Sequence, residues 1–142
     1  MSDLESKFKV YYFTAVFSML FAVIGFTYNA WRLEISEDNN NIRTAAFEVL
    51  TELAEFQQLI YSAHYDQDMV AGNPRNGWVK IGLIVDLSSL ISESVTEKSL
   101  VLHKNWSSNW GCIQSSRSTT DKLVNDIDKV RIEIKQALKY LE

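Results

Sequence analysis

The sequence predicts an all-α protein in which one N-terminal transmembrane helix precedes an antiparallel four-helix-bundle-like domain. Three observations carry this prediction. The run from Val10 to Trp31 contains no Asp, Glu, Lys, Arg or His. In the later segments, apolar residues recur at intervals of three and four, as in amphipathic helices. One proline and five glycines in 142 residues favour long helices over many short strands.

The uncharged run 10–31 has the length and the ends of a transmembrane helix. At about 1.5 Å per residue it extends about 33 Å, which is enough to cross the hydrocarbon core of a bilayer. Tyr11 and Tyr12 stand near one end, and Tyr28 and Trp31 near the other. Aromatic residues at both ends are typical of the two membrane interfaces.

A cleavable signal peptide is the alternative interpretation of this run. Its apolar core would be shorter, and a small-residue cleavage site would follow it. Here the exit reads Thr-Tyr-Asn-Ala at 27–30, with a bulky Tyr28 in place of a small residue. We therefore expect a retained anchor and the following division of the chain: a short tail at 1–9, the transmembrane helix at 10–31, a juxtamembrane linker at 32–41 and a helical bundle domain at 42–142.

Orientation depends on a nearly balanced count of positive residues. Lys7 and Lys9 precede the anchor, whereas Arg32 and Arg43 follow it. We expect the N-terminus in the cytoplasm and the domain in the periplasm, with the protein in the bacterial inner (plasma) membrane. The alternative is a cytoplasmic domain.

Small residues form one stripe along the predicted transmembrane helix. Their spacing is three, four, three and four, and the stripe ends in an amide: Ala15, Ser18, Ala22, Gly25 and Asn29. Lipid tails do not drive helices together, so helices associate in bilayers through close packing over small residues and through hydrogen bonds. The stripe therefore predicts contact with another transmembrane helix. Chance alignment of small residues is the alternative.

The remaining helices are predicted from periodicity and capping signals. Residues 36–41 are either a short linker or a weak stretch of a continuous helix. Apolar residues from Ile42 to Ala63 recur at threes and fours, and this helix is expected to end around residues 66–71, before Gly72. Asn73-Pro74 predicts a cap and a first helical position. The segment 78–91 alternates like a strand, but a lone strand lacks partners. We expect there a buried, central helix that is apolar nearly all round.

Two further helices complete the predicted domain. Ser94 to Glu97 reads as a capping box, and the helix that it opens is expected to end at Gly111, a suitable C′ residue. After a polar loop, Leu123, Ile127 and further apolar residues at heptad spacing predict a helix to Leu141.

Composition and motifs argue against catalysis. The chain carries 14 Lys and Arg against 18 Asp and Glu, a net charge of −4, which argues against nucleic acid as a partner. Catalytic and nucleotide-binding motifs are absent, so we expect neither an enzyme nor a cofactor or metal. His64, Asp66 and Asp68 are spaced for a divalent ion, but a solvated helix end is the expected role. The single cysteine, Cys112, is expected to be a small buried residue.

Aromatic residues form the other candidate site. His103, Trp106 and Trp110 share one face of a predicted helix, and Trp78 is expected to lie opposite. They indicate either a core or partner interface or, alternatively, a ligand pocket. Residues 105–107 also match the glycosylation sequon, which is frequent by chance.

Charges differ between two of the predicted helices. The helix at 42–63 carries several glutamates, and the last helix carries five Lys and Arg residues. If these two helices are neighbours, their charged faces would complement each other. The default expectation is that the charged residues of both helices, Asp126 among them, form solvated faces.

The layout of a membrane helix leading into a helical bundle is similar to the sensor domain of bacterial chemoreceptors and membrane histidine kinases. Those proteins return through a second membrane helix to an output domain, whereas this chain stops at Glu142. We therefore expect a small membrane-anchored accessory or assembly subunit, with other membrane-protein subunits or a second copy as partner. The alternative is a membrane-tethered helical ligand-binding module.

Overall fold

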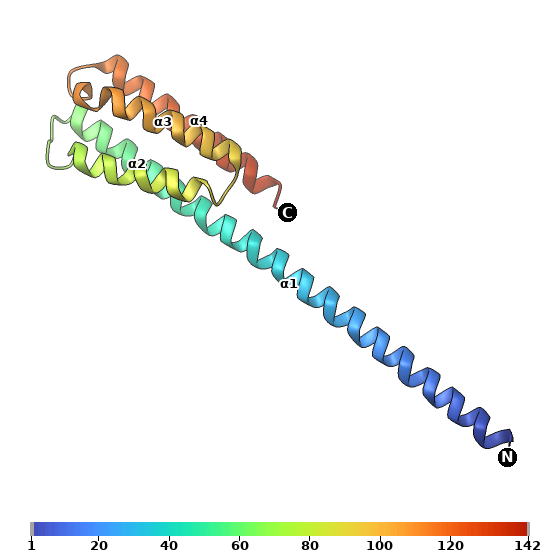
Figure 1. The fold of residues 1–142 in the computed structure, drawn as a ribbon. Helices are drawn as coiled ribbons and strands as arrows, with labels where there is room; N and C mark the ends of the chain where they lie inside the picture. Colours follow the sequence, from blue (N-terminus) through green and yellow to red (C-terminus); the bar gives the residue numbers. More distant parts are fainter. Residues whose placement is uncertain (1, 142) are drawn as a thin grey trace. The chain divides into compact units, whose positions relative to one another are not determined.

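The computed structural model describes residues 2–141, and the side chains of residues 4–141, as an all-helical protein (Figure 1). Its elements in chain order are α1 (Ser2–His64), α2 (Pro74–Ser88), α3 (Glu93–Asn109), the 3-10 helix η1 (Trp110–Cys112) and α4 (Arg117–Lys139). No strand occurs in this described part. The predicted all-α class, with one long apolar helix at the N-terminus, is confirmed.

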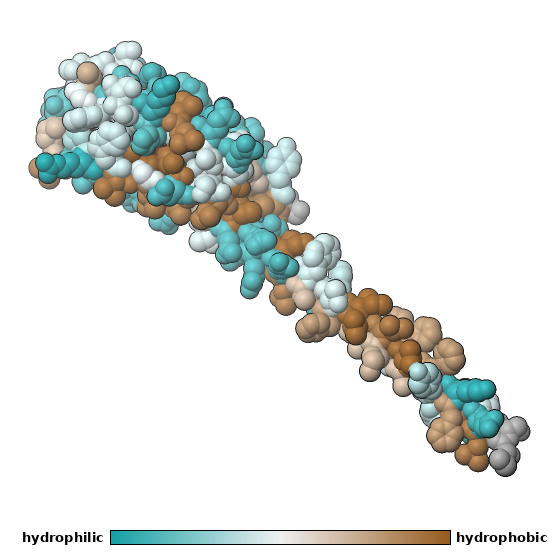
Figure 2. Space-filling model, in the orientation of Figure 1, coloured by the Kyte–Doolittle hydropathy of each residue, from teal (hydrophilic) through white to brown (hydrophobic). Residues whose placement is uncertain are grey.

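The chain divides into two compact units, residues 1–38 and 39–142. The first unit is the N-terminal part of α1, and its apolar side chains form the brown band along that helix in Figure 2. The second unit, called here the helical domain, contains the rest of α1 and all later elements. The backbone is helical throughout 36–41, which is the second of the two alternatives that the sequence left open there.

All four α-helices of the helical domain contribute to one hydrophobic core. Its largest fully buried side chains come from every helix: Val49, Leu53, Phe56, Ile60, Ile81, Ile84, Leu102, Trp106, Leu123, Ile127 and Ile134, with Ile113 from the loop before α4. Burying one such side chain contributes about 1.5–3 kcal/mol. The three-and-four spacing that predicted the helices therefore marks the faces that form this core.

A loop at residues 65–73 joins α1 to α2. Gln67 has a left-handed backbone conformation, with φ of 54°, and Asp68 Oδ1 accepts hydrogen bonds from two backbone N–H groups of the turn. Gly72 passes so close to α1 that a Cβ atom there would lie 2.5 Å from the backbone nitrogen of Ala63. Glycine is therefore needed at this position for α2 to return alongside α1.

Side-chain caps begin the later helices. Asn73 caps α2 by accepting a hydrogen bond from the Arg75 N–H at 3.0 Å, with Pro74 at the first helical position. This confirms the predicted start of α2. Ser116 caps α4 in the same way through the Thr119 N–H. Each such cap satisfies one N–H group that the helix leaves without a partner.

The predicted start of α3 was wrong by two residues. Ser92, not Ser94, is the N-cap, and its hydroxyl accepts a hydrogen bond from the Val95 N–H at 3.3 Å. Val95, in the first turn of α3, and Ile91, just before its cap, are both buried in the core. At the other end, α3 ends at Asn109 with Trp110 as its C-cap, so Gly111 stands at the expected C′ position. It does not adopt the left-handed conformation usual there, since no glycine in the described chain has a positive φ, and it lies inside η1.

The ambiguous segment 78–91 lies mostly in α2, but its predicted central position was wrong. Ile81 and Ile84 are fully buried, whereas Val79 is 71% exposed and Leu83 is also exposed. The helix therefore buries one face only. Apolar residues on its other face produced the alternation that resembled a strand.

Polar contacts connect α1 to α2 and to the residues that follow α4. Lys80 of α2 bridges Glu52 and Glu55 of α1. These two glutamates therefore pair with α2, and no ion pair among the described residues joins α1 to the basic residues of α4. Near the end of α4, the Leu141 carbonyl accepts hydrogen bonds from Arg43 at 3.0 Å and from Asn39 at 3.4 Å.

Candidate functional site

The first candidate site is the apolar part of α1 in the N-terminal unit. None of its residues from 10 to 31 is buried against other parts of the protein. The helix is long and apolar enough to span a membrane. Large side chains such as Phe13, Phe21 and Phe26 are exposed along it. A contiguous apolar surface of this size needs an apolar environment or a partner.

Hydroxyl groups within this segment are satisfied by the helix itself. Thr14 Oγ1 donates to the Val10 carbonyl, and Thr27 Oγ1 donates to the Val23 carbonyl, both at 2.9 Å. A hydroxyl bonded to the preceding turn can enter hydrocarbon without leaving its donor unpaired. The two threonines are therefore compatible with a segment that lies in lipid.

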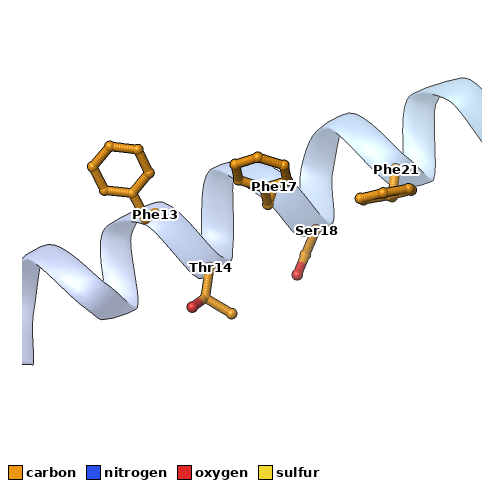
Figure 3. Close-up of a pocket in the computed structure, with 5 residues that line it drawn as sticks. All are labelled: Phe13, Thr14, Phe17, Ser18 and Phe21. Carbon is orange, nitrogen blue, oxygen red and sulfur yellow. The ribbon is translucent and has the colours of Figure 1, made fainter.

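The small-residue stripe occupies open surface. A Cβ atom added to Gly25 would meet no atom within 4 Å. A shallow hollow on this helix includes Ser18 of the stripe in its lining. Figure 3 draws the lining side chains, with Thr14 and Ser18 projecting away from the rings of Phe13 and Phe17. Because one helix supplies the whole lining of this hollow, its shape suits a neighbouring helix or a lipid chain better than a small ligand.

The second candidate site is the aromatic group of the helical domain. Trp106 is fully buried, and its ring lies edge-on to Phe56 at 5.0 Å and to Trp78 at 6.3 Å between ring centroids. Trp78 also stacks edge-on against His103 at 5.7 Å. These are favourable aromatic geometries, and they place Trp106 at the centre of the core.

A glycine makes room for the Trp106 ring. A Cβ atom on Gly77 would lie 2.4 Å from Trp106 Cζ2 and 2.8 Å from Cη2. Because real Cβ atoms do not approach that closely, the α2 backbone contacts the indole directly. Sequence reasoning missed Gly77, although a glycine inside an apolar helical segment is a known sign of close packing.

Trp110 does not join the other three aromatic residues. It lies in η1, is 44% exposed, and forms none of the ring pairs found in the described chain. The surface part of the group is therefore the edge formed by Trp78, which is 37% exposed, and the half-buried His103.

A buried carboxylate lies between α3 and α4. Asp126 is almost fully buried, and it accepts hydrogen bonds from the Asn105 amide and from Lys129 Nζ, the latter at 2.9 Å. Sequence reasoning treated Asp126 as part of a solvated face. Its position directly before the core residue Ile127 was the available signal. The contact also engages the asparagine of the sequon at 105–107 within the fold.

A second charged cluster joins α1 to α2. Burial lowers the pKa of the Lys80 ammonium, but hydrogen bonds and charge attraction from Glu55 and Glu52 outweigh that effect and raise the pKa above its ordinary value of 10.5. The cluster therefore links α1 to α2 through ion pairs. Two glutamates three residues apart on one helical face were the signal in the sequence.

The remaining candidate residues lie apart. Cys112 is exposed, so its predicted burial was wrong: η1 lies at the surface instead of continuing the buried face of α3. His64 Nδ1 lies 2.9 Å from the Ile113 carbonyl, and because a carbonyl only accepts, Nδ1 carries the proton. Asp68 caps its own turn. Within residues 2–141, no three His, Cys, Asp or Glu side chains form a metal-binding group.

Comparison with protein families, characterised proteins and solved structures finds no match to this chain. Its function is therefore inferred from its own residues.

Proposed function

We propose that the protein is a small single-pass accessory or assembly subunit of a membrane complex. The segment 10–31 anchors it in the inner membrane, with the N-terminus in the cytoplasm and the helical domain in the periplasm. The observation that carries the proposal is the apolar helix of the N-terminal unit, which has no burial within the protein. A bilayer supplies the apolar environment that this surface needs.

The helical domain is proposed to be an antiparallel four-helix bundle outside the bilayer. Contacts at the two ends of the part of α1 that belongs to the helical domain support this arrangement. His64, at the end of α1, lies against the Ile113 carbonyl just before α4 begins, whereas Arg43 and Asn39 bond to Leu141 just after α4 ends. Short connections between successive helices, as here, are typical of antiparallel neighbours.

A partner is proposed to pack on the small-residue stripe. Gly25 leaves its side of the helix open, so a second helix can approach the backbone closely. Asn29 forms no side-chain hydrogen bond within residues 2–141, and an amide near the end of a membrane helix gains by bonding to a neighbouring helix.

Replacing Gly25 by Leu tests this proposal. Because nothing lies within 4 Å of a Cβ there, the larger side chain leaves the fold of the protein unchanged but blocks close approach. The matched control is Val23→Leu, which enlarges an exposed apolar side chain on another face of the same helix. Tagged variants are extracted in mild detergent, and co-purifying proteins are quantified.

We expect Gly25→Leu to lose the partner while it resists alkaline carbonate extraction like the wild type. Val23→Leu should keep both properties. Undiminished association in Gly25→Leu would contradict the role of the stripe. Release of the wild-type protein by carbonate would contradict the anchor itself.

A membrane-tethered ligand-binding module is the second candidate function. The partly exposed Trp78 beside His103 favours it, because an accessible indole face can bind a cation. Choline is a suitable probe of the full-length protein in detergent. Saturable quenching of tryptophan fluorescence, lost in Trp78→Ala, would support the module, and unchanged fluorescence would argue against it.

A further inference from the structure

The outward face of α1 in the helical domain carries a continuous strip of uncharged residues. We call it the α1 outer strip. Its members follow one another at alternating steps of four and three: Asn40, Thr44, Phe47, Thr51, Ala54, Gln58, Tyr61 and Tyr65. All are exposed except the half-buried Tyr61. Phe47, with 61% of its surface exposed, is the most exposed of the large hydrophobic residues in the strip.

This spacing is the heptad pattern of a helix that packs along its length against another helix. The residues that α1 contributes to its own core, such as Val49, Leu53 and Phe56, lie on the opposite side and are fully buried. The described helices α2, α3 and α4 leave the strip uncovered. In this part α1 therefore has two lengthwise faces, of which only one is packed.

The exposed charges of α1 in this region lie along the edges of the strip. Arg43 stands on one edge, and Glu48 and Glu55 stand on the other. Glu48 follows Arg43 by five residues, so they occupy the g and e positions that meet across a parallel pair of helices. Neither residue forms an ion pair within residues 2–141: Arg43 donates to the Leu141 carbonyl, and Glu48 has no basic partner.

We propose that the α1 outer strip binds the same strip of a second copy of this chain, with the two helices parallel. Each Arg43 then meets Glu48 of the other copy, so the charges match twice about a two-fold axis. The inference rests on the proposed membrane anchor, because two copies inserted in one membrane have the same polarity and can align only in the parallel sense.

The composition of the strip sets the strength of this contact. Threonine, asparagine and glutamine supply half of its positions, and Phe47 is its main apolar anchor, so the interface is weak between freely diffusing molecules. Anchoring both copies in one membrane raises their effective concentration. Dimers are therefore expected in native membranes and are expected to dissociate on dilution in detergent.

Cysteine cross-linking in native membranes tests the proposal with the full-length chain. The exposed Cys112 is first replaced by serine. Single cysteines are then introduced as Thr44→Cys, Thr51→Cys and Ala54→Cys on the strip, which leaves Phe47 in place. The matched controls are Val79→Cys on α2 and Lys104→Cys on α3, which are also exposed but lie outside it. After mild oxidation, the strip variants should form a covalent dimer, and the controls should remain monomeric.

Charge exchange supplies an independent readout. Arg43→Glu and Glu48→Arg each replace two attractive pairs by repulsive ones, so each should lower cross-linking through Thr51→Cys about threefold or more. The double variant restores opposite charges and should recover the wild-type yield. Recovery separates pairing between copies from the loss of the Arg43 bond to Leu141, which the double variant does not repair.

Each result distinguishes this inference from the proposed function. Carbonate-resistant protein without strip cross-links would refute the dimer and leave the anchor standing. Equal cross-linking of the strip and control variants would also refute the strip as the interface. A strip cross-link to a protein of different mass would show another partner and overturn the assignment to a second copy. Protein released by carbonate would refute both proposals.

Discussion

Replacing Gly77 by alanine should destabilise the helical domain through one contact. The new methyl group would lie 2.4 Å from Trp106 Cζ2 and 2.8 Å from Cη2. The indole is fully buried and packs edge-on against Phe56, so it has little room to move away. Either the ring or the α2 backbone must shift by about 1 Å to restore normal contact, and overpacking of this kind costs about 1–3 kcal/mol.

Gly82 on the same helix provides the matched control. A Cβ atom there meets nothing within 4 Å, so Gly82→Ala keeps only the gain in helix propensity, about 1 kcal/mol at most. Both variants share this gain, and the difference between them isolates the contact with Trp106. Gly77→Ala should therefore be less stable than Gly82→Ala by about 1–3 kcal/mol, with Tm lower by about 4–8 °C for each kcal/mol.

The assay is thermal unfolding of the full-length protein in detergent micelles, followed by far-UV circular dichroism and by tryptophan fluorescence. Equal stability of the two variants would refute the reasoning, because it would show that the ring and the α2 backbone separate without cost. The double variant Gly77→Ala with Trp106→Phe should recover part of the clash energy, which a merely local effect on α2 would not do.

Three further predictions concern polar groups. Contacts with two glutamates raise the Lys80 pKa above 10.5, so the stabilising contribution of Lys80 is complete below that pH and is lost as pH rises through the higher folded value. Lys80→Met should therefore lower Tm near neutral pH. Between about pH 9 and 12, the variant should also lose less stability than the wild type. Asn105→Ala removes one hydrogen bond from the buried Asp126 carboxylate and should cost about 1–3 kcal/mol in urea unfolding, whereas the exposed control Lys104→Ala should stay within about 0.5 kcal/mol. The exposed Cys112 thiol should react fully with a thiol reagent in the folded protein, and a requirement for denaturant would contradict its position.

Much of the fold could be predicted because periodicity reports directly on burial. Apolar residues at intervals of three and four marked the buried faces of α1 and α4, and Asn73-Pro74 marked the start of α2. Helix was the correct choice for α2 because an isolated strand would leave its backbone groups without partners.

The remaining details depend on contacts between distant parts of the chain. Two serines, Ser92 and Ser94, are both suitable caps for α3, and only the folded backbone shows that the Ser92 hydroxyl accepts the hydrogen bond from the Val95 N–H. Apolar composition overestimated the burial of α2, because a surface helix also carries exposed apolar residues such as Val79.

The candidate sites were predictable only in part. The helical period correctly placed Trp106 on an inward face, but it could not show that Trp110 leaves that face when the chain enters η1. Asp126 was missed because a charged residue is ordinarily assigned to solvent. Its burial requires Asn105 and Lys129 at the same place, and only the packing of α3 on α4 brings Asn105 there.

The bonds from Asn39 and Arg43 to the Leu141 carbonyl have a mechanical consequence. They place the first and the last turns of the helical domain side by side, so tension applied between these points acts across the helices and not along them. Such a force breaks the contacts between the first and last helices one after another, beginning with the two hydrogen bonds to the Leu141 carbonyl. The domain is therefore expected to unfold at low force, as α1 and α4 separate progressively from the end near Leu141.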